Sequence, residues 1–272
     1  MAAAESPPLK TLRQSPLLNS AAIADGIFRL EFGWPGPVPK AGQFFMIKPE
    51  RSSVFLPRPV GAESFGGGKL RFLIAVRGRG TRELAAMRPG ESAGLSGPLG
   101  NCWEDFFPPE GPGDGDGKAI ALVAGGVGLA PLSSLAASFP DREFDYYLGV
   151  RSAFKNDAGE AAFLGEAALH HRQLLVAAET GGAKHRGLIT GFFDPAGYSA
   201  VFACGPEAML RAAAAKCREA AVPCRVSLER RMACGVGACL GCTVVTGKGS
   251  RRCCADGPIF KAEELAFDEQ RQ

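Results

Sequence analysis

The sequence predicts a β plus α/β fold in three successive parts, and three observations carry that prediction. Short runs of alternating apolar and polar residues, separated by turn residues, fill the N-terminal part and are typical of an antiparallel β-barrel. Continuous apolar strands then alternate with helical stretches, which indicates a parallel sheet of the nucleotide-binding type. Finally, all but one of the nine cysteines lie at or beyond Cys204, which predicts a small C-terminal module held together by a metal.

The bulk composition of the 272 residues excludes several classes of protein. Hydrophobic residues make up 46% and charged residues 22%, and the net charge of +3 is too small to favour nucleic acid or an anionic membrane as a partner. No N-terminal stretch has the pattern of an export signal, so we expect a soluble, cytoplasmic protein. The uncharged stretch from Ala119 to Phe139 is long enough to cross a bilayer, but glycines and Pro131 interrupt it. A buried strand, a glycine turn and a helix are expected there instead.

The first part, residues 1–107, contains four strand-like runs and one short helical stretch. The helix is expected only from Thr81 to Met87, and turn sequences such as Trp34–Pro37 separate the runs. The even spacing of short strands predicts an antiparallel barrel. The expected strands are 26–32, 42–49, 69–78 and 90–101.

The second part, residues 118–221, follows the acidic and glycine-rich stretch 108–118, which is a natural domain boundary. Gly125, Gly126 and Gly128 lie between an apolar strand and a helix that begins near Pro131. Such a loop permits close approach of a dinucleotide to the helix N-terminus, but a tight packing turn has the same residues, and the sequence leaves both interpretations open. The expected strands are 119–126, 144–152, 172–180 and 198–206, and a further helix is expected from Glu207 to Ala221.

The third part, residues 222–272, carries the strongest single motif of the chain. Cys234, Cys239 and Cys242 have C-x4-C-x2-C spacing among glycines, which matches the plant-type ferredoxin ligation of a [2Fe–2S] cluster. Zinc sites favour two C-x2-C pairs or mixed Cys/His sets, and here the histidines lie far upstream. A fourth ligand has to come from Cys253 or Cys254. If that stretch is a strand, the two side chains face opposite ways and only one reaches the cluster, but spacing does not choose between them.

These motifs together reveal a family resemblance that extends over nearly the whole chain. The stretch RRMACGVGACLGCTVV, followed by RRCCADGPIF, resembles the electron-transfer subunit of bacterial NAD-dependent (class 1B) dihydroorotate dehydrogenases. In that family the fourth cysteine stands two residues before Asp-Gly-Pro, which implies that Cys254 is the fourth ligand and that Cys253 takes the place of an apolar residue. The family belongs to the ferredoxin-reductase group. The resemblance therefore implies an N-terminal FAD-binding barrel, an NAD-binding α/β domain and a C-terminal [2Fe–2S] domain.

The resemblance also implies which residues hold FAD and NAD. The family's Arg-Pro-x-Ser motif corresponds to Arg58, Pro59, Val60 and Gly61, so the serine hydroxyl is missing here. Arginine suits a pyrophosphate because its planar fork binds two oxygens at once. Thr81 is expected to cap a short helix whose N-terminus binds phosphate. The remaining residues that the resemblance implies are Leu73, Ile74, Ala75 and Gly80 for FAD and Gly125, Gly126 and Gly128 for NAD.

The family implies a route for electrons and a partner. A catalytic subunit carrying FMN would oxidise dihydroorotate to orotate in pyrimidine biosynthesis, and electrons would pass through [2Fe–2S] and FAD to NAD, in a heterotetramer with two copies of each subunit. Arg230, Arg231, Arg251 and Arg252 flank the cysteines and form either a docking rim or a solubilising surface. An alternative keeps the cofactors in a diaphorase subunit of a hydrogenase- or sulfur-reductase-type complex. A third, non-enzymatic interpretation is a zinc-stabilised binding module.

Overall fold

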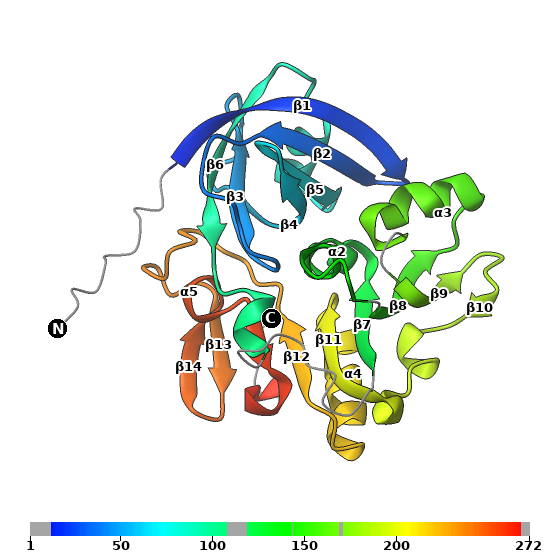
Figure 1. Ribbon diagram of the computed structural model, residues 1–272. Coiled ribbons are helices and arrows are strands. Elements are labelled where there is room, and N and C mark those ends of the chain that lie inside the picture. The colour runs from blue at the N-terminus through cyan, green and yellow to red at the C-terminus, as the bar shows by residue number, and fades with distance from the viewer. Residues whose placement is uncertain (1–11, 108–118, 143, 169–170, 268–272) are drawn as a thin grey trace.

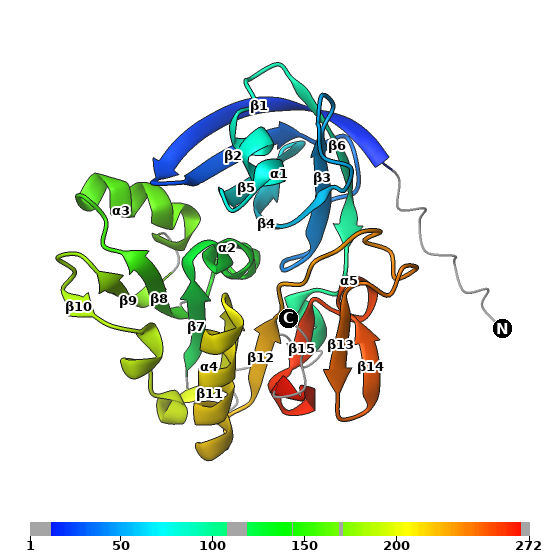
Figure 2. The same cartoon turned by 180° about the vertical axis from the view of Figure 1, so that it is seen from behind.

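The computed structural model describes residues 12–107, 119–142, 144–168 and 171–267 (Figure 1). The predicted boundary at 108–118 lies outside the described residues. The fold consists of a β-barrel, a mixed α/β sheet and a small cysteine-rich hairpin module, as the sequence predicts. Figure 2 shows the same arrangement from behind, with the barrel above the sheet and the hairpin beside both.

The N-terminal barrel closes in the strand order β1-β2-β5-β4-β3-β6. Its core contains Phe32, Phe45 and Phe72, whose rings meet edge to face at centroid distances of 5.6 to 6.1 Å. Such contacts add specificity to the large apolar area that each ring buries. The elements are β1 (Leu12–Ala24), β2 (Ile27–Gly33), β3 (Phe44–Pro49), β4 (Arg58–Gly66), β5 (Lys69–Ala75), α1 (Arg79–Ala85), β6 (Ser92–Leu99) and the 3-10 turn η1 (Trp103–Phe106).

Two barrel strands, β1 and β4, are absent from the sequence-based prediction. β1 contains Pro16 and polar residues, and β4 begins with Arg58-Pro59 and includes two glycines, so neither has the composition of a strand. Both form because closure of the barrel supplies partners on each side: β1 pairs with β2 and β6, and β4 pairs with β3 and β5. Tertiary pairing therefore overrides local propensity in this barrel.

The second sheet has seven strands in the order β10-β9-β8-β7-β11-β12-β15, all parallel except β15. The expected strands and helices of this part are all present. The elements are β7 (Ala119–Gly125), η2 (Gly126–Gly128), α2 (Leu129–Ser138), β8 (Phe144–Ser152), α3 (Asp157–Leu164), η3 (Gly165–Ala168), β9 (His171–Thr180), β10 (His185–Arg186), η4 (Ile189–Gly191), η5 (Pro195–Gly197), β11 (Tyr198–Cys204), α4 (Glu207–Glu219), β12 (Cys224–Ser227) and β15 (Ile259–Lys261).

The stretch 119–139 folds as β7, η2 and α2, in agreement with the expected strand, turn and helix. Among the described residues, no helix has the length and apolar character needed to span a bilayer.

The cysteine-rich module is an insertion between β12 and β15. It contains the hairpin β13 (Thr243–Thr246) and β14 (Gly249–Arg252) and the short helix α5 (Cys253–Asp256), and η6 (Ala262–Glu264) follows β15. The expected boundary at residue 221 falls just before β12, yet β12 and β15 complete the seven-stranded sheet. The module therefore extends from the edge of the sheet and packs into the same hydrophobic core as the sheet. This shared core explains how a segment with so few apolar residues is ordered.

Helix α2 lies between the barrel and the sheet and joins them (Figure 1). Gly61 of β4 lies against Pro131 of α2, so that an added Cβ would lie 3.5 Å from the proline ring. The buried indole of Trp103 donates to the Pro131 carbonyl at 2.9 Å. A second connection is the Arg29 guanidinium, which pairs with Glu63 at 2.7 Å and also donates to carbonyls of α3.

We predict that Arg29→Met lowers the free energy of unfolding by about 3 kcal/mol, because it leaves the Glu63 carboxylate buried without a cation. The Glu63 side chain is only 2% exposed. Lys69→Met is the control, since Lys69 pairs with Glu31 at the surface and its loss costs less than about 1 kcal/mol. Urea unfolding measures both. Equal costs for the two variants, or a double variant Arg29→Met/Glu63→Met as unstable as the sum of the singles, would contradict this account.

Candidate functional site

The loop from Cys234 to Cys242, here termed the cysteine loop, has a backbone that only certain residues allow. Gly235 and Gly237 have φ values of +70° and +82°, in the left-handed region that favours glycine. A Cβ on Gly235 would meet Met46 of β3 at 2.7 Å, and one on Gly237 would meet Ala255 of α5 at 3.0 Å. The glycines therefore let the loop wrap tightly against both the barrel and α5.

Backbone N–H groups point at the cysteine sulfurs. Gly237 N donates to Cys254 Sγ at 3.1 Å, Val236 N to Cys234 Sγ at 3.4 Å, and Cys254 N to Cys242 Sγ at 3.4 Å. Burial raises the pKa of the Cys234 thiol, but the N–H donors around it outweigh that effect and lower the pKa to about 6. The N–H donors around Cys234 therefore favour its thiolate, the form that binds metal.

The four sulfurs form two pairs. Cys234 shares a hydrogen bond with Cys239, and Cys242 shares one with Cys254. No three His, Cys, Asp or Glu side chains within the described ranges converge tightly enough to hold a single metal ion. A [2Fe–2S] cluster has two irons and needs two pairs of thiolates, so the arrangement fits it better than it fits one zinc ion.

The two adjacent cysteines of α5 lie in different surroundings. The two cysteines lie in a helix, so the argument that adjacent residues of a strand face opposite ways does not apply to them. Both side chains are buried. Cys254 receives the Gly237 N–H and contacts Cys242, whereas Cys253 Sγ donates to the Leu228 carbonyl at 3.5 Å. Burial raises the pKa of both thiols to about 12, so the hydrogen-bond partners, and not the pKa values, distinguish the two cysteines.

Asn101, which follows β6 and Gly100, ties the C-terminal segment to the barrel. Its amide donates to the carbonyls of Asp256 and Ile259 and accepts from Ile259 N at 3.0 Å, while its own N–H donates to the Gly257 carbonyl. The sequence pattern indicates only that a barrel strand ends here. The structural role of Asn101 is to position the segment that follows Cys254.

The basic residues around the cysteines do not act alike. Arg230 is paired with Glu207 of α4 at 2.8 Å and its side chain is only 13% exposed, so it is not part of an exposed rim. Arg252 is exposed but pairs with Asp256, and Arg231 and Arg251 are exposed. The exposed tip of the cysteine loop is itself apolar: Val236 is 47% and Leu240 61% exposed.

On the barrel side, the structure brings together Arg58 and Gly80. The Arg58 guanidinium occupies the space that a Cβ on Gly80 would need, so the start of β4 and the start of α1 meet there. Arg58, Pro59, Val60 and Gly61 are all partly exposed on β4. A cation on an open strand end, beside a small residue, fits an anionic group such as a pyrophosphate.

The other barrel residues implied for FAD have different surroundings. Leu73 and Ile74 are 3% and 2% exposed and belong to the apolar cores, so only their backbone is available, and Ala75 is half-buried at the end of β5. The expectation that Thr81 caps the helix is wrong: the cap is Gly78, and α1 begins at Arg79, two residues earlier than expected. Thr81 Oγ1 instead accepts from the N–H groups of Arg77 and Gly78.

The glycine loop after β7 combines the two interpretations that the sequence left open. A Cβ on Gly128 would strike the Cys204 carbonyl, and one on Gly125 would meet Pro206 at 2.5 Å. Both glycines are therefore required for packing against the turn at the end of β11, Cys204–Pro206. Gly126 has φ +54°, and no atom lies within 4 Å of the point where a Cβ would stand, so it faces open space. Of these three glycines, only Gly126 leaves room for close approach of a ligand.

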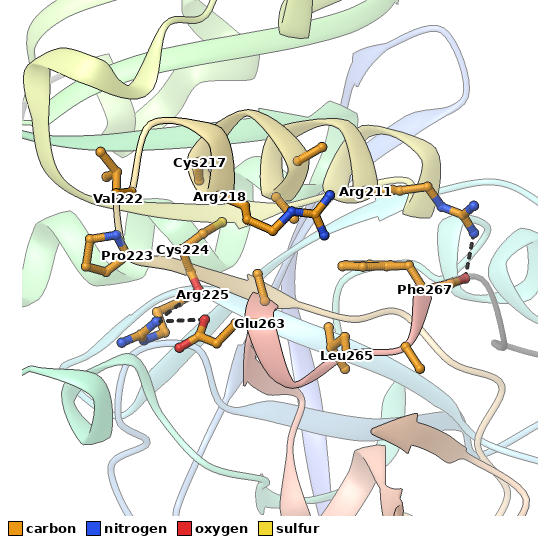
Figure 3. A pocket seen from close by; sticks show the side chains of 15 residues that line it. Arg211, Cys217, Arg218, Val222, Pro223, Cys224, Arg225, Glu263, Leu265 and Phe267 are labelled. Atoms are coloured by element: carbon orange, nitrogen blue, oxygen red, sulfur yellow. Dashed lines mark hydrogen bonds and ion pairs between the residues drawn. The ribbon is translucent and has the colours of Figure 1, made fainter. Parts of the chain in front are cut away.

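A cavity of about 740 Å³ lies elsewhere, between α4 and the segment after β15 (Figure 3). Cys217 and Cys224 line it, together with Arg211, Arg218 and apolar side chains. None of the residues predicted for FAD, NAD or the metal lines this cavity. It is therefore separate from the candidate site.

We predict that Gly128→Ala lowers the free energy of unfolding by about 3 kcal/mol, because its Cβ meets strand backbone that cannot move aside. Gly126→Ala is expected to cost only about 1 kcal/mol, because alanine adopts a left-handed φ less readily than glycine. Gly197→Ala, at a site with open space and ordinary φ, is the control and should change stability by less than about 0.5 kcal/mol. Urea unfolding distinguishes them, and equal costs at positions 126 and 128 would refute the packing role of Gly128.

Comparisons with known proteins agree with this geometry. Residues 229–266 match the model of the iron-sulfur cluster binding domain of dihydroorotate dehydrogenase B. A dihydroorotate dehydrogenase B (NAD(+)) electron transfer subunit from Caldanaerobacter subterraneus subsp. tengcongensis is 35% identical over 257 residues, covering 92% of this chain and 97% of the relative. The subunit of the same name from Clostridium perfringens is 34% identical, with coverage of 90% and 94%.

Solved structures show the same fold. An NADH-dependent reduced ferredoxin-NADP oxidoreductase, described for flavin-based electron bifurcation, superposes with a TM-score of 0.74 at 26% identity and covers 94% of this chain and 90% of its own. A ferredoxin NADP+ reductase from Neisseria gonorrhoeae with bound FAD and NADP has a TM-score of 0.59 at 17% identity, with coverage of 76% and 91%. With relatives above 30% identity over nearly its full length, the chain belongs to the family of electron transfer subunits of dihydroorotate dehydrogenase B (NAD(+)).

Proposed function

We propose that the chain carries electrons from an FMN-containing catalytic subunit, which oxidises dihydroorotate, through a [2Fe–2S] cluster and FAD to NAD+. The observation that carries this proposal is the pairing of Cys234 with Cys239 and of Cys242 with Cys254 of α5, where the cysteine loop packs against the barrel. When bound, FAD converts between the one-electron transfer of an iron–sulfur cluster and the two-electron hydride transfer of NAD, which neither of them can do alone.

In this proposal each cofactor is held by residues whose surroundings suit it. Cys234, Cys239, Cys242 and Cys254 are the iron ligands, because each sulfur has a paired thiol and backbone N–H groups lie beside the loop. Burial and the neighbouring Cys242 raise the pKa of Cys254 to about 12, so a cation at the site is needed to hold both sulfurs as thiolates. The family motif adds a separate argument for Cys254.

FAD is assigned to the rim of the barrel and NAD to the loop after β7. Arg58 at the open end of β4 is the cation for the FAD pyrophosphate, with Pro59, Val60, Gly61 and Gly80 around it. The backbone of Leu73, Ile74 and Ala75 lines the same rim. Gly126 faces open space for the dinucleotide, while Gly125 and Gly128 hold the loop in place.

The exposed tip of the cysteine loop is the proposed docking face for the catalytic subunit. Val236 and Leu240 present apolar surface there, and Leu240 holds a left-handed φ of +59° between two ligand cysteines. Arg231 and Arg251, which flank the cysteines in the sequence, are exposed. We assign two copies of each subunit to the complex, and a cytoplasmic location, where nine free cysteines remain reduced.

The partner assignment is tested by co-purification of tagged protein from its own cells under anaerobic conditions. We expect an FMN-containing protein to co-purify and the pair to reduce NAD+ when dihydroorotate is added. Leu240→Asp should reduce recovery of the partner at least about tenfold with iron content unchanged, while Leu188→Asp, at a similarly exposed leucine just before η4, should not. Full dihydroorotate-dependent activity of the isolated chain would refute the proposal.

The ligand assignment is tested by iron and sulfide counts on purified variants. We predict that Cys254→Ser loses at least about half of the iron and the visible absorbance, because it removes one of four thiolates. Cys253→Ser should retain both, since that thiol contacts the Leu228 carbonyl instead. Cys217→Ser, a buried thiol outside the module, is the control. Equal iron loss from the Cys253 and Cys254 variants would overturn the assignment.

A further inference from the structure

Arg252, the last residue of β14, is held in one position by a single carboxylate. The Asp256 carboxylate accepts from the backbone N–H of Arg252 at 2.7 Å and from its Nε and Nη2 at 3.1 Å each. The arginine side chain is 44% exposed, and a side chain of this length that is not bonded samples many rotamers. The paired hydrogen bonds of the planar fork therefore fix where its positive charge lies.

The fixed guanidinium stands between Asp256 and the cysteine loop. Asp256 binds the edge that is formed by Nε and Nη2. Beside the opposite edge, a Cβ on Gly237 would lie 3.4 Å from Nη1 and 3.6 Å from Cδ of Arg252. The positive charge is therefore closer to the loop than the carboxylate that partly offsets it.

Gly237 also connects this charge to the cysteine sulfurs. Its N–H donates to Cys254 Sγ at 3.1 Å, and covalent geometry across Gly237 places Nη1 no more than about 9 Å from that sulfur. Cys254 and Cys242 both contribute to raising the pKa of the Arg252 guanidinium, after the larger contribution of Asp256. Charges at this separation still interact in dilute salt, because the Debye length is about 10 Å at 0.1 M and longer below that.

We propose that Arg252 raises the reduction potential of the cluster and that Asp256 is the positioning residue that holds the guanidinium beside Cys242 and Cys254. The inference rests on the proposed function, in which these cysteines hold iron. Reduction adds one negative charge to a cluster that four thiolates already surround, and a fixed cation nearby stabilises that added charge. Arg252 thus has a role besides docking or solubility.

The test is the midpoint reduction potential of the cluster in the purified chain, from an anaerobic titration followed by electron paramagnetic resonance at low ionic strength. Arg252→Gln and Arg252→Met both remove the charge, and methionine keeps an apolar stem against Gly237. Each should lower the equilibrium constant for one-electron reduction about threefold, which corresponds to about 30 mV for one electron.

Two further variants separate charge from structure. Arg252→Lys keeps the charge and should stay within about 1.5-fold of the parent equilibrium constant, although it loses the planar fork. Lys248→Gln removes the same charge in the turn at the opposite end of the hairpin, where Lys248 pairs with Glu264. Because that turn lies about 13 Å away along the strand, this control should also stay within about 1.5-fold.

An unchanged potential in both neutral variants overturns the inference, as does an equal shift in Arg252→Lys or Lys248→Gln. Loss of iron from both neutral variants also overturns it, because Arg252 then serves only to hold the loop. None of these measurements uses dihydroorotate, NAD or a partner. Failure of the proposed function is therefore recognised separately, when the parent protein holds no iron or accepts no electrons from dihydroorotate through its partner.

Discussion

The close packing of the cysteine loop against the barrel is the constraint on which the remaining structure depends. Gly235 lies on Met46 and Leu99, and Asn101 fixes the backbone just after Cys254 by four hydrogen bonds. Because β12 and β15 on either side of the module belong to the large sheet, the loop is held by barrel and sheet together. Electron transfer between bound groups requires that their separation stay fixed, and this packing supplies the rigidity.

Glycines lie where chain segments pack closely. At Gly61 of the barrel, Pro131 of α2 occupies the space beside the backbone, which is a contact between the barrel and the α/β part. At Gly80 and Gly128 that space is filled from within the same part, by Arg58 and by the Cys204 carbonyl. Of the three glycines in the loop after β7, only Gly126 faces open space. The glycines of the sequence motifs therefore serve two different purposes: most of them allow close packing, and Gly126 leaves room beside the backbone.

Much of the architecture could be predicted because its signals are local. Continuous apolar runs predicted β7, β8, β9 and β11 within a few residues, and the C-x4-C-x2-C motif lies within the residues that match an iron-sulfur cluster binding domain. β1 and β4 were missed because partners distant in the sequence, rather than their own composition, make them strands. The cap of α1 was predicted at Thr81, three residues too late, because Gly78, which has no side chain, caps the helix.

The central claim is that electrons pass between the dinucleotide and the cysteine loop through FAD held at the barrel rim. Anaerobic electron paramagnetic resonance tests it on this chain alone: NADH is added to protein containing iron and FAD, and to the same protein stripped of FAD. We predict the signal of a reduced [2Fe–2S] cluster only in the first sample, with dithionite producing it in both. An equal signal in both samples after NADH, or none in either while dithionite gives one, would contradict the account.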